Sequence, residues 1–167
     1  MSVIEVDTAI RRLRFADLDI PCTIGRSGAC SAEAKREGDG CTPTGIWPIR
    51  AVLLRPDRVT LPALRLPWRW TRPNDGWSDA PADPAYNRPI HLPRLCSTES
   101  LQREDALYDI IVILGHNDAP PVPGAGSAIF FHLWIDAKPT EGCVAIARED
   151  MLALLPRLQS GDVMAIL

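Results

Sequence analysis

Lysine is almost absent from this chain of 167 residues, and arginine carries most of its positive charge. The 18 basic residues do not balance the 21 acidic ones, so the formal net charge is −3 and the pI is about 5.6. Domains that bind nucleic acids usually present a basic face. The composition has no excess of basic residues to form such a face, and we expect no nucleic acid among the partners.

Long hydrophobic runs are also missing. A helix that crosses a membrane needs roughly 18 or more consecutive apolar residues, and no window of the sequence reaches that length. The segment from Met1 to Asp7 lacks the basic stretch followed by an apolar run that marks a secretory signal. We therefore expect no membrane span, and no export signal is visible.

Paired cysteine motifs are a third absence. The five cysteines are scattered and odd in number, and none belongs to a CxxC pair. This spacing argues against zinc ribbons and thioredoxin-like sites. An odd count without a signal peptide favours reduced thiols over a disulfide framework. We expect four of the five to be small core residues, namely Cys22, Cys30, Cys41 and Cys96.

The chain does contain an ordinary globular balance, with 46% hydrophobic and 23% charged residues. Its length fits one domain with a sizeable core, and no internal repeat or low-complexity linker divides it. We predict a single domain over residues 1–167. Because 16 Pro and 11 Gly interrupt the chain, long helices are excluded over most of it. The predicted fold class is mainly β with one or two short helices.

Hydrophobic periodicity predicts where the elements lie. The β-branched run over 109–114 is typical of a strand buried on both faces. Apolar positions at helical spacing predict one helix at about 148–158. A charged loop over 31–40 is expected to be solvated, and the Pro-rich segment 71–93 to be irregular. Further strands are predicted over 13–15, 18–24, 46–54, 61–66, 68–71, 127–134 and 162–167.

Chemistry is indicated where a histidine and a cysteine lie close together in the sequence. His132 lies at the end of a predicted strand, and Cys143 directly follows Gly142. A reactive cysteine needs a depressed pKa, most often from a neighbouring imidazole. It also needs backbone N–H groups directed at a developing oxyanion. The short connection between the two residues would let Cys143 fold back onto the strand that carries His132.

Residues 129–132 (Ile-Phe-Phe-His) and 140–144 (Thr-Glu-Gly-Cys-Val) resemble the catalytic signature of the YkuD-type L,D-transpeptidases. That signature is a strand ending in His, then [Ser/Thr]-x-Gly-Cys and a short apolar stretch. Upstream, residues 42–47 (Thr-Pro-Thr-Gly-Ile-Trp) are similar to the family's Thr-Pro-x-Gly-x-aromatic element. Three more segments resemble a compact, single-domain bacterial branch of the family, namely residues 35–40, 75–77 and 115–118.

The resemblance implies a β-sandwich-like catalytic domain that acts on peptidoglycan stem peptides or muropeptides without a cofactor. Carried over, Cys143 is the nucleophile, and His132 is the base and later the acid. The Leu133 carbonyl would orient the imidazole, Gly142 and Cys143 would supply oxyanion amides, and Thr140 would brace the loop. The acyl group would pass to an amine, giving a cross-link, or to water, giving hydrolysis. The oligomeric state stays open.

Two positions differ from the family pattern. Glu141 stands where a second His is usual, and Ala145 stands where an Arg commonly follows the Cys. Arg148 is our candidate to replace that Arg.

The other substrate-binding candidates come from further along the chain. They are His116 and Asn117, after a buried strand, and Trp77. His116 serves equally well as a turn cap, and Trp77 as an anchor that holds its loop to the core.

Two alternatives stay open at the sequence level. One is a zinc-dependent peptidase using His116, Asp118 and His132, with Cys143 as a fourth ligand; the other is a non-catalytic module that binds wall peptides. Location also stays open, because the family implies the cell envelope or periplasm, whereas the lack of a visible signal leaves the cytoplasm open as well.

Overall fold

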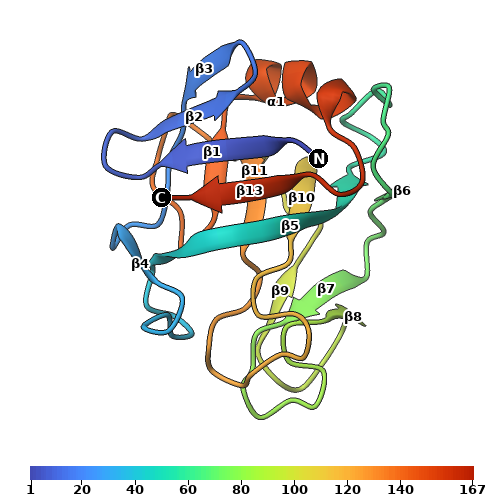
Figure 1. Cartoon of the computed structure of the whole chain (residues 1–167). Helices are drawn as coiled ribbons and strands as arrows, with labels where there is room; N and C mark the ends of the chain where they lie inside the picture. The colour runs from blue at the N-terminus through green and yellow to red at the C-terminus, as the bar shows by residue number, and fades with distance from the viewer.

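The computed structural model describes residues 1–167 and is mainly β, which confirms the predicted fold class (Figure 1). Its one α-helix, α1 (Arg148–Leu154), continues into a 3-10 helix, η1 (Leu155–Arg157). The α-helix ends there because Pro156 has no N–H to donate to the preceding turn. No helix is long and apolar enough to cross a membrane.

Ten strands form the main sheet. Eight of them follow the order β12-β11-β10-β5-β13-β1-β2-β3, while β4 and β6 pair with β5. Their bounds are β1 (Val3–Asp7), β2 (Arg12–Phe15), β3 (Leu18–Pro21), β4 (Ala29–Ser31), β5 (Thr42–Leu54), β6 (Trp68–Trp70), β10 (Ile110–Leu114), β11 (Phe130–Leu133), β12 (Val144–Ile146) and β13 (Val163–Ile166). A smaller sheet has the order β8-β7-β9, with β7 (Asp75–Ser78), β8 (Pro89–His91) and β9 (Thr98–Ser100).

The long strand β5 joins the two halves of the main sheet. Residues 45–48 pair with β13, and residues 49–54 pair with β10. One half, β13-β1-β2-β3, therefore lies in front of the other, β10-β11-β12, in Figure 1, and α1 closes the top. A core cluster of 25 buried residues fills the space between these parts.

Strand β10 is buried on both faces, as its β-branched run predicts. Ile110 and Val112 belong to the main core, whereas Ile111 belongs to a second cluster of eight buried residues. Trp77 of β7 and Leu101, next to β9, belong to that second cluster, so the small sheet covers the outer face of β10. Cys143 and Phe130 lie in the same cluster, which places the candidate nucleophile between the two sheets.

Two predictions about secondary structure are wrong. Residues 61–66 form no strand and contribute one isolated bridge, between Arg65 and Gln159. The segment 71–93 is not irregular throughout, because it contains β7 and β8. Both of these strands are only three or four residues long, and long-range pairing rather than local pattern forms them.

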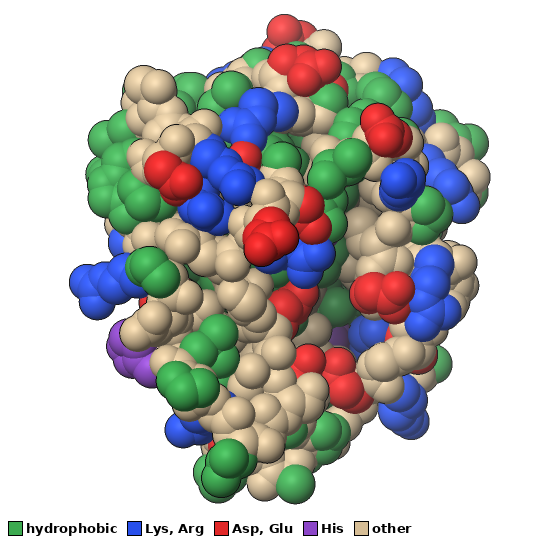
Figure 2. All heavy atoms as spheres, turned by 180° about the vertical axis from the view of Figure 1, so that it is seen from behind, with side chains coloured by type: hydrophobic (Ala, Val, Ile, Leu, Met, Phe, Trp, Pro, Cys, Tyr) green, Lys and Arg blue, Asp and Glu red, His purple; other side chains and the backbone are tan.

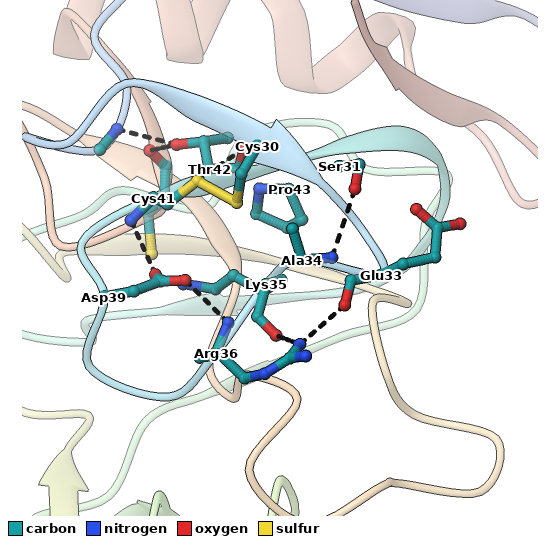
Figure 3. Close-up of a disulfide and its surroundings, with 12 residues drawn as sticks. Cys30, Ser31, Glu33, Ala34, Lys35, Arg36, Asp39, Cys41, Thr42 and Pro43 are labelled. Carbon is teal, nitrogen blue, oxygen red and sulfur yellow. Dashed lines mark hydrogen bonds and ion pairs between the residues drawn. A yellow bond between two sulfur atoms is a disulfide. The ribbon is translucent and has the colours of Figure 1, made fainter.

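The expectation of reduced thiols is wrong for Cys30 and Cys41, which form a disulfide (Figure 3). Strand β4 runs parallel to the start of β5, with Cys30 opposite Pro43. This pairing brings the two Cα atoms to 6.0 Å, within the range that a disulfide spans. The chain between them is closed into a loop. Cys22 is buried as expected, while Cys96 is only partly buried.

Candidate active site

A cavity of about 770 Å³ opens between the β11–β12 pair and the segments that face it. His132, Cys143 and Thr140 line one wall, and Lys35, Glu99 and Tyr108 lie among the other lining residues. Figure 2 shows the molecule from behind the view of Figure 1, with acidic and basic side chains around a hollow near the centre of that face. The structure thus brings several of the predicted site residues to one cavity.

Strand register places His132 and Cys143 on the same face. In the parallel pair β11–β12, His132 lies opposite Ala145. Cys143 stands two residues before Ala145, and side chains two apart along an extended chain share a face. Both residues are buried, at 4% and 7% exposure, and both line the cavity.

The Cys143 thiol is held by the backbone next to it. Its Sγ accepts the Phe130 N–H at 3.3 Å and donates to the Ala128 carbonyl at 3.2 Å. Burial raises the pKa of this thiol to about 12; the nearby Glu99 carboxylate also raises it, while the Phe130 amide and Lys35 lower it. The resting group is therefore a neutral thiol near neutral pH.

The His132 ring is fixed by a backbone carbonyl. Its Nδ1 lies 2.6 Å from the Leu133 oxygen, which can only accept, so Nδ1 carries the proton and Nε2 keeps a free lone pair. Burial lowers the pKa of His132 to about 4, against smaller opposing effects from the Leu133 carbonyl and others. A neutral imidazole with a free Nε2 is the form that accepts a proton.

The turn before Cys143 is braced by one hydroxyl. Thr140 Oγ1 donates to the Cys143 carbonyl at 2.7 Å and accepts the Gly142 N–H at 3.1 Å. The Cys143 N–H has no partner within the protein. Of the two predicted oxyanion amides, one is thus free and the other is bound to Thr140. Gly142 has φ +139°, a conformation that favours glycine.

Trp77 lies outside this cavity. Its indole N–H donates to Asn87 at 2.9 Å, and its ring meets the edge of Phe130 at 5.1 Å between centroids. These contacts anchor β7 to the core, and Trp77 has the structural role rather than the substrate-binding one.

His116 and Asn117 also lie away from the cavity lining. His116 is buried with its ring 4.8 Å from that of Trp47, and its Nδ1 has no partner. Asn117 binds Val122 and Gly126 through its side-chain amide. Asn117 therefore holds the connection between β10 and β11.

Arg148 does not reach the cavity either. Its guanidinium pairs with the buried carboxylate of Asp109 and approaches the Arg58 carbonyl at 3.4 Å. Asp109 also binds Arg58 at 3.2 Å. Arg148 is thus committed to a neighbouring ion-pair cluster at the start of α1.

The ligands of the zinc alternative are not brought together. His132 lines the cavity, His116 packs on Trp47, and Asp118 pairs with Arg50 at 2.8 Å. Only Cys30, Asp39 and Cys41 have three potential ligand atoms within 4.8 Å of one another, and two of these are the sulfurs of the disulfide.

The expectation of a solvated loop over 31–40 is wrong for Lys35. This lysine is 2% exposed and lines the cavity, where it pairs with Asp39. A buried lysine needs such a partner. The one hint in the sequence is that Lys35 is one of only two lysines, the other being Lys138.

Glu99 and Tyr108 are further cavity residues that sequence reasoning missed. The Tyr108 hydroxyl donates to Glu99 at 2.5 Å, and its ring lies 5.1 Å from that of His132. Burial raises the pKa of Glu99, and it raises the pKa of Tyr108 well above its usual value. No local motif marks either residue, and Glu99 reaches the site through the pairing of β9 with β7.

Among the solved structures that match this chain are three with low sequence identity to it. An L,D-transpeptidase from Mycobacterium smegmatis is 12% identical with a TM-score of 0.47, covering 99% of this chain and 58% of that one. L,D-transpeptidase 1 of Mycobacterium tuberculosis is 10% identical with a TM-score of 0.45, covering 99% and 60%. Bdellovibrio bacteriovorus Bd1075 is 18% identical with a TM-score of 0.48, covering 99% and 47%.

This chain therefore spans about half the length of the solved structures that it matches. No curated protein sequence matches it. The family model of the YkuD L,D-transpeptidase catalytic domain matches residues 2–166, nearly the whole chain. The chain belongs to the YkuD family of L,D-transpeptidase catalytic domains.

Proposed function

We propose that the protein transfers acyl groups on peptidoglycan stem peptides through a thioester on Cys143, with His132 as the general base. The observation that carries this proposal is the placement of both side chains on one face of β11 and β12, at the wall of one cavity. Membership in the L,D-transpeptidase catalytic domain family supports the substrate class.

The first half-reaction begins from a neutral thiol and a neutral imidazole. Nε2 of His132 takes the thiol proton while Sγ attacks the carbonyl carbon of the stem peptide. The carbonyl electron pair moves onto oxygen, where the free Cys143 N–H is available to donate. The imidazolium then gives its proton to the leaving amine, and the thioester remains.

The second half-reaction regenerates the thiol. An amine or water attacks the thioester carbonyl, His132 takes a proton from the attacking group, and Cys143 leaves and is protonated. An amine acceptor gives a cross-link, and water gives a shortened stem. Thr140 holds the Cys143 carbonyl through both half-reactions by donating to it at 2.7 Å.

The Cys30–Cys41 disulfide bears on where this reaction occurs. Disulfides persist in oxidising compartments outside the bacterial cytoplasm and are rare inside it. Peptidoglycan also lies outside the cytoplasm. We infer that the protein acts in the cell envelope.

Incubation with defined tetrapeptide and pentapeptide muropeptides, with and without an acceptor amine, tests the proposal by mass spectrometry. Loss of the terminal D-amino acid, with or without a new cross-link, is the expected result. The presence or absence of the cross-linked product separates transpeptidation from hydrolysis. Unchanged muropeptides with a correctly folded protein would contradict the proposal, and binding without turnover would favour the wall-peptide-binding alternative.

A further inference from the structure

Lys35 is a charged side chain buried in the wall of the cavity. Its side chain is 3% exposed, and it comes from the loop that the Cys30–Cys41 disulfide closes (Figure 3). Removing an ammonium group from water costs several kcal/mol unless partners compensate it. The other lysine of the chain, Lys138, is exposed, so the burial of Lys35 requires an explanation.

The loop around Lys35 is built to hold the ammonium in place. Asp39 pairs with it and also accepts the backbone N–H groups of Arg36, at 2.7 Å, and Cys41, at 2.9 Å. Burial alone would raise the pKa of Asp39, but these donors hold it below its usual value. Gly126 leaves room for the lysine stem, because a Cβ there would lie 2.9 Å from Lys35 Cε.

The ammonium lies over the residue that precedes the nucleophile. A Cβ built on Gly142 would come within 3.4 Å of Lys35 Nζ, and the free N–H of Cys143 is the next amide along the chain. An ammonium has three donors, and Asp39 is its one hydrogen-bond partner in the protein. Donors therefore remain for negative charge that develops at residues 142 and 143.

Three carboxylates that line the cavity are engaged by other groups. Glu37 accepts the Tyr86 hydroxyl at 2.5 Å, Glu99 accepts that of Tyr108 at 2.5 Å, and Glu141 pairs with Arg26 at 2.9 Å.

The field of Lys35 reaches two titrating groups. It lowers the pKa of Cys143. It also lowers the pKa of His116, which is about 4 mainly because the ring is buried. At Cys143, Lys35 favours the thiolate and Glu99 opposes it.

We propose that Lys35 supplies the positive charge of the acyl-transfer centre, stabilising the negative charge on the Cys143 sulfur and then on the carbonyl oxygen of the tetrahedral intermediate. The proposal rests on the function proposed above and assigns this role to a residue outside the Cys-His signature. As the thiol proton passes to His132 Nε2, the sulfur pair forms the C–S bond and the carbonyl pair moves to oxygen. Lys35 exchanges no proton and acts through its fixed charge.

Two substitutions test this role, because one removes the positive charge near Cys143 and the other removes a negative charge near it. Lys35→Met removes the cation and keeps an unbranched side chain one atom shorter, while Glu99→Gln removes the opposing anion and keeps an acceptor for Tyr108. Alkylation of Cys143 by iodoacetamide is followed by intact mass from pH 6 to 10, alongside acylation by a carbapenem. The disulfide and the thermal unfolding of each variant are checked in parallel.

Lys35→Met is expected to slow both reactions by about 10-fold or more at each pH, with the concentration dependence of acylation changed by less than about threefold. Glu99→Gln is expected to speed alkylation. If Lys35→Met folds poorly, the double variant Lys35→Met/Asp39→Asn leaves no unpaired buried carboxylate and is expected to show the same loss.

Three outcomes separate the proposals. Parent-like alkylation and acylation by a folded Lys35 variant would overturn the role of Lys35. Weaker substrate binding with unchanged alkylation would also overturn it, because Lys35 would then bind a substrate carboxylate. A parent protein that alkylates but never forms an acyl-enzyme would refute the proposed function, while the alkylation rates would still report the charge effect.

Discussion

The cavity has two walls of different origin. The β11–β12 wall carries His132, Thr140 and Cys143 within twelve residues of sequence. The rest of the lining, the second wall, takes Lys35 from an early loop, Glu99 from β9 of the small sheet and Tyr108 from the segment before β10. The first wall is a local motif joined by parallel strand pairing. The second is assembled from distant parts of the chain that a disulfide and long-range strand pairing hold in place. We infer that the first wall performs bond exchange and the second sets the charge around it.

The largest expected effect concerns the first wall. His132→Ala removes the free Nε2 lone pair, so acylation of Cys143 by a carbapenem is expected to fall by ~10²-fold or more. Intact-mass time courses measure this rate. Thr140→Ser is a matched control on the same wall, because it keeps the hydroxyl that braces the turn. A His132→Ala rate equal to the parent's would remove His132 from the mechanism.

The second wall is tested by opening its disulfide. Cys30→Ser/Cys41→Ser is expected to lower the free energy of unfolding by about 2–3 kcal/mol, the usual scale for a loop of this size. Acylation is expected to slow as well, because Asp39 and Lys35 lose the closed loop that positions them. Urea denaturation and acylation rates measure the two effects. Unchanged acylation in the double variant would show that the loop holds its shape without the cross-link.

The pH dependence of the acylation rate tests whether His132 titrates as a buried histidine or as an exposed one. Because the pKa of His132 is lowered to about 4 by burial, the neutral base persists above that pH and is lost only as the pH falls through it. The acid limb of the acylation rate is expected near pH 4 rather than near 6.5. A midpoint between pH 6 and 7 would show that His132 is solvated during the reaction.

The free energy of unfolding also depends on the protonation of the buried histidines. Burial lowers the pKa of both His116 and His132 to about 4. Between pH 6.5 and 4, these two side chains are therefore protonated in the unfolded chain but neutral in the folded protein. The free energy of unfolding is therefore expected to fall as the pH is lowered from 7 to 5. Urea denaturation at the two pH values measures it, and equal stability would contradict the burial of these rings.

The smallest expected effect on catalysis is that of Arg148→Ala. Arg148 lies outside the cavity and binds Asp109, so its loss is expected to cost stability of about 1 kcal/mol while acylation changes by less than about twofold. Thermal unfolding and the acylation rate measure both. A large loss of acylation with normal stability would contradict this and would show that Arg148 contributes to the reaction.

The contrast between the walls also explains what the sequence reveals. The β-branched run at β10 and the apolar spacing of α1 are local patterns, and the structure has both elements close to where they were predicted. The His-to-Cys motif is equally local, and the structure brings its residues to one cavity. Their roles in catalysis remain predictions.

What the sequence does not reveal depends on distant pairing. Lys35 looks like a solvated charge until Cys30 and Cys41 close its loop, and an odd cysteine count conceals that pair. Glu99 reaches the cavity because β9 pairs with β7, a contact that no local periodicity encodes. Arg148 lies near Cys143 in sequence yet turns to Asp109, since a buried carboxylate needs a cation.

The central claim is that Cys143 forms the acyl-enzyme, and intact-mass spectrometry of the protein with a tetrapeptide muropeptide or a carbapenem tests it directly. The parent protein is expected to gain the mass of one acyl group, mapped to Cys143 by peptide analysis, and Cys143→Ala is expected to gain none. Cys22 and Cys96, the two other free cysteines, are expected to stay unmodified. Acylation of Cys143→Ala at the parent's rate would contradict the account.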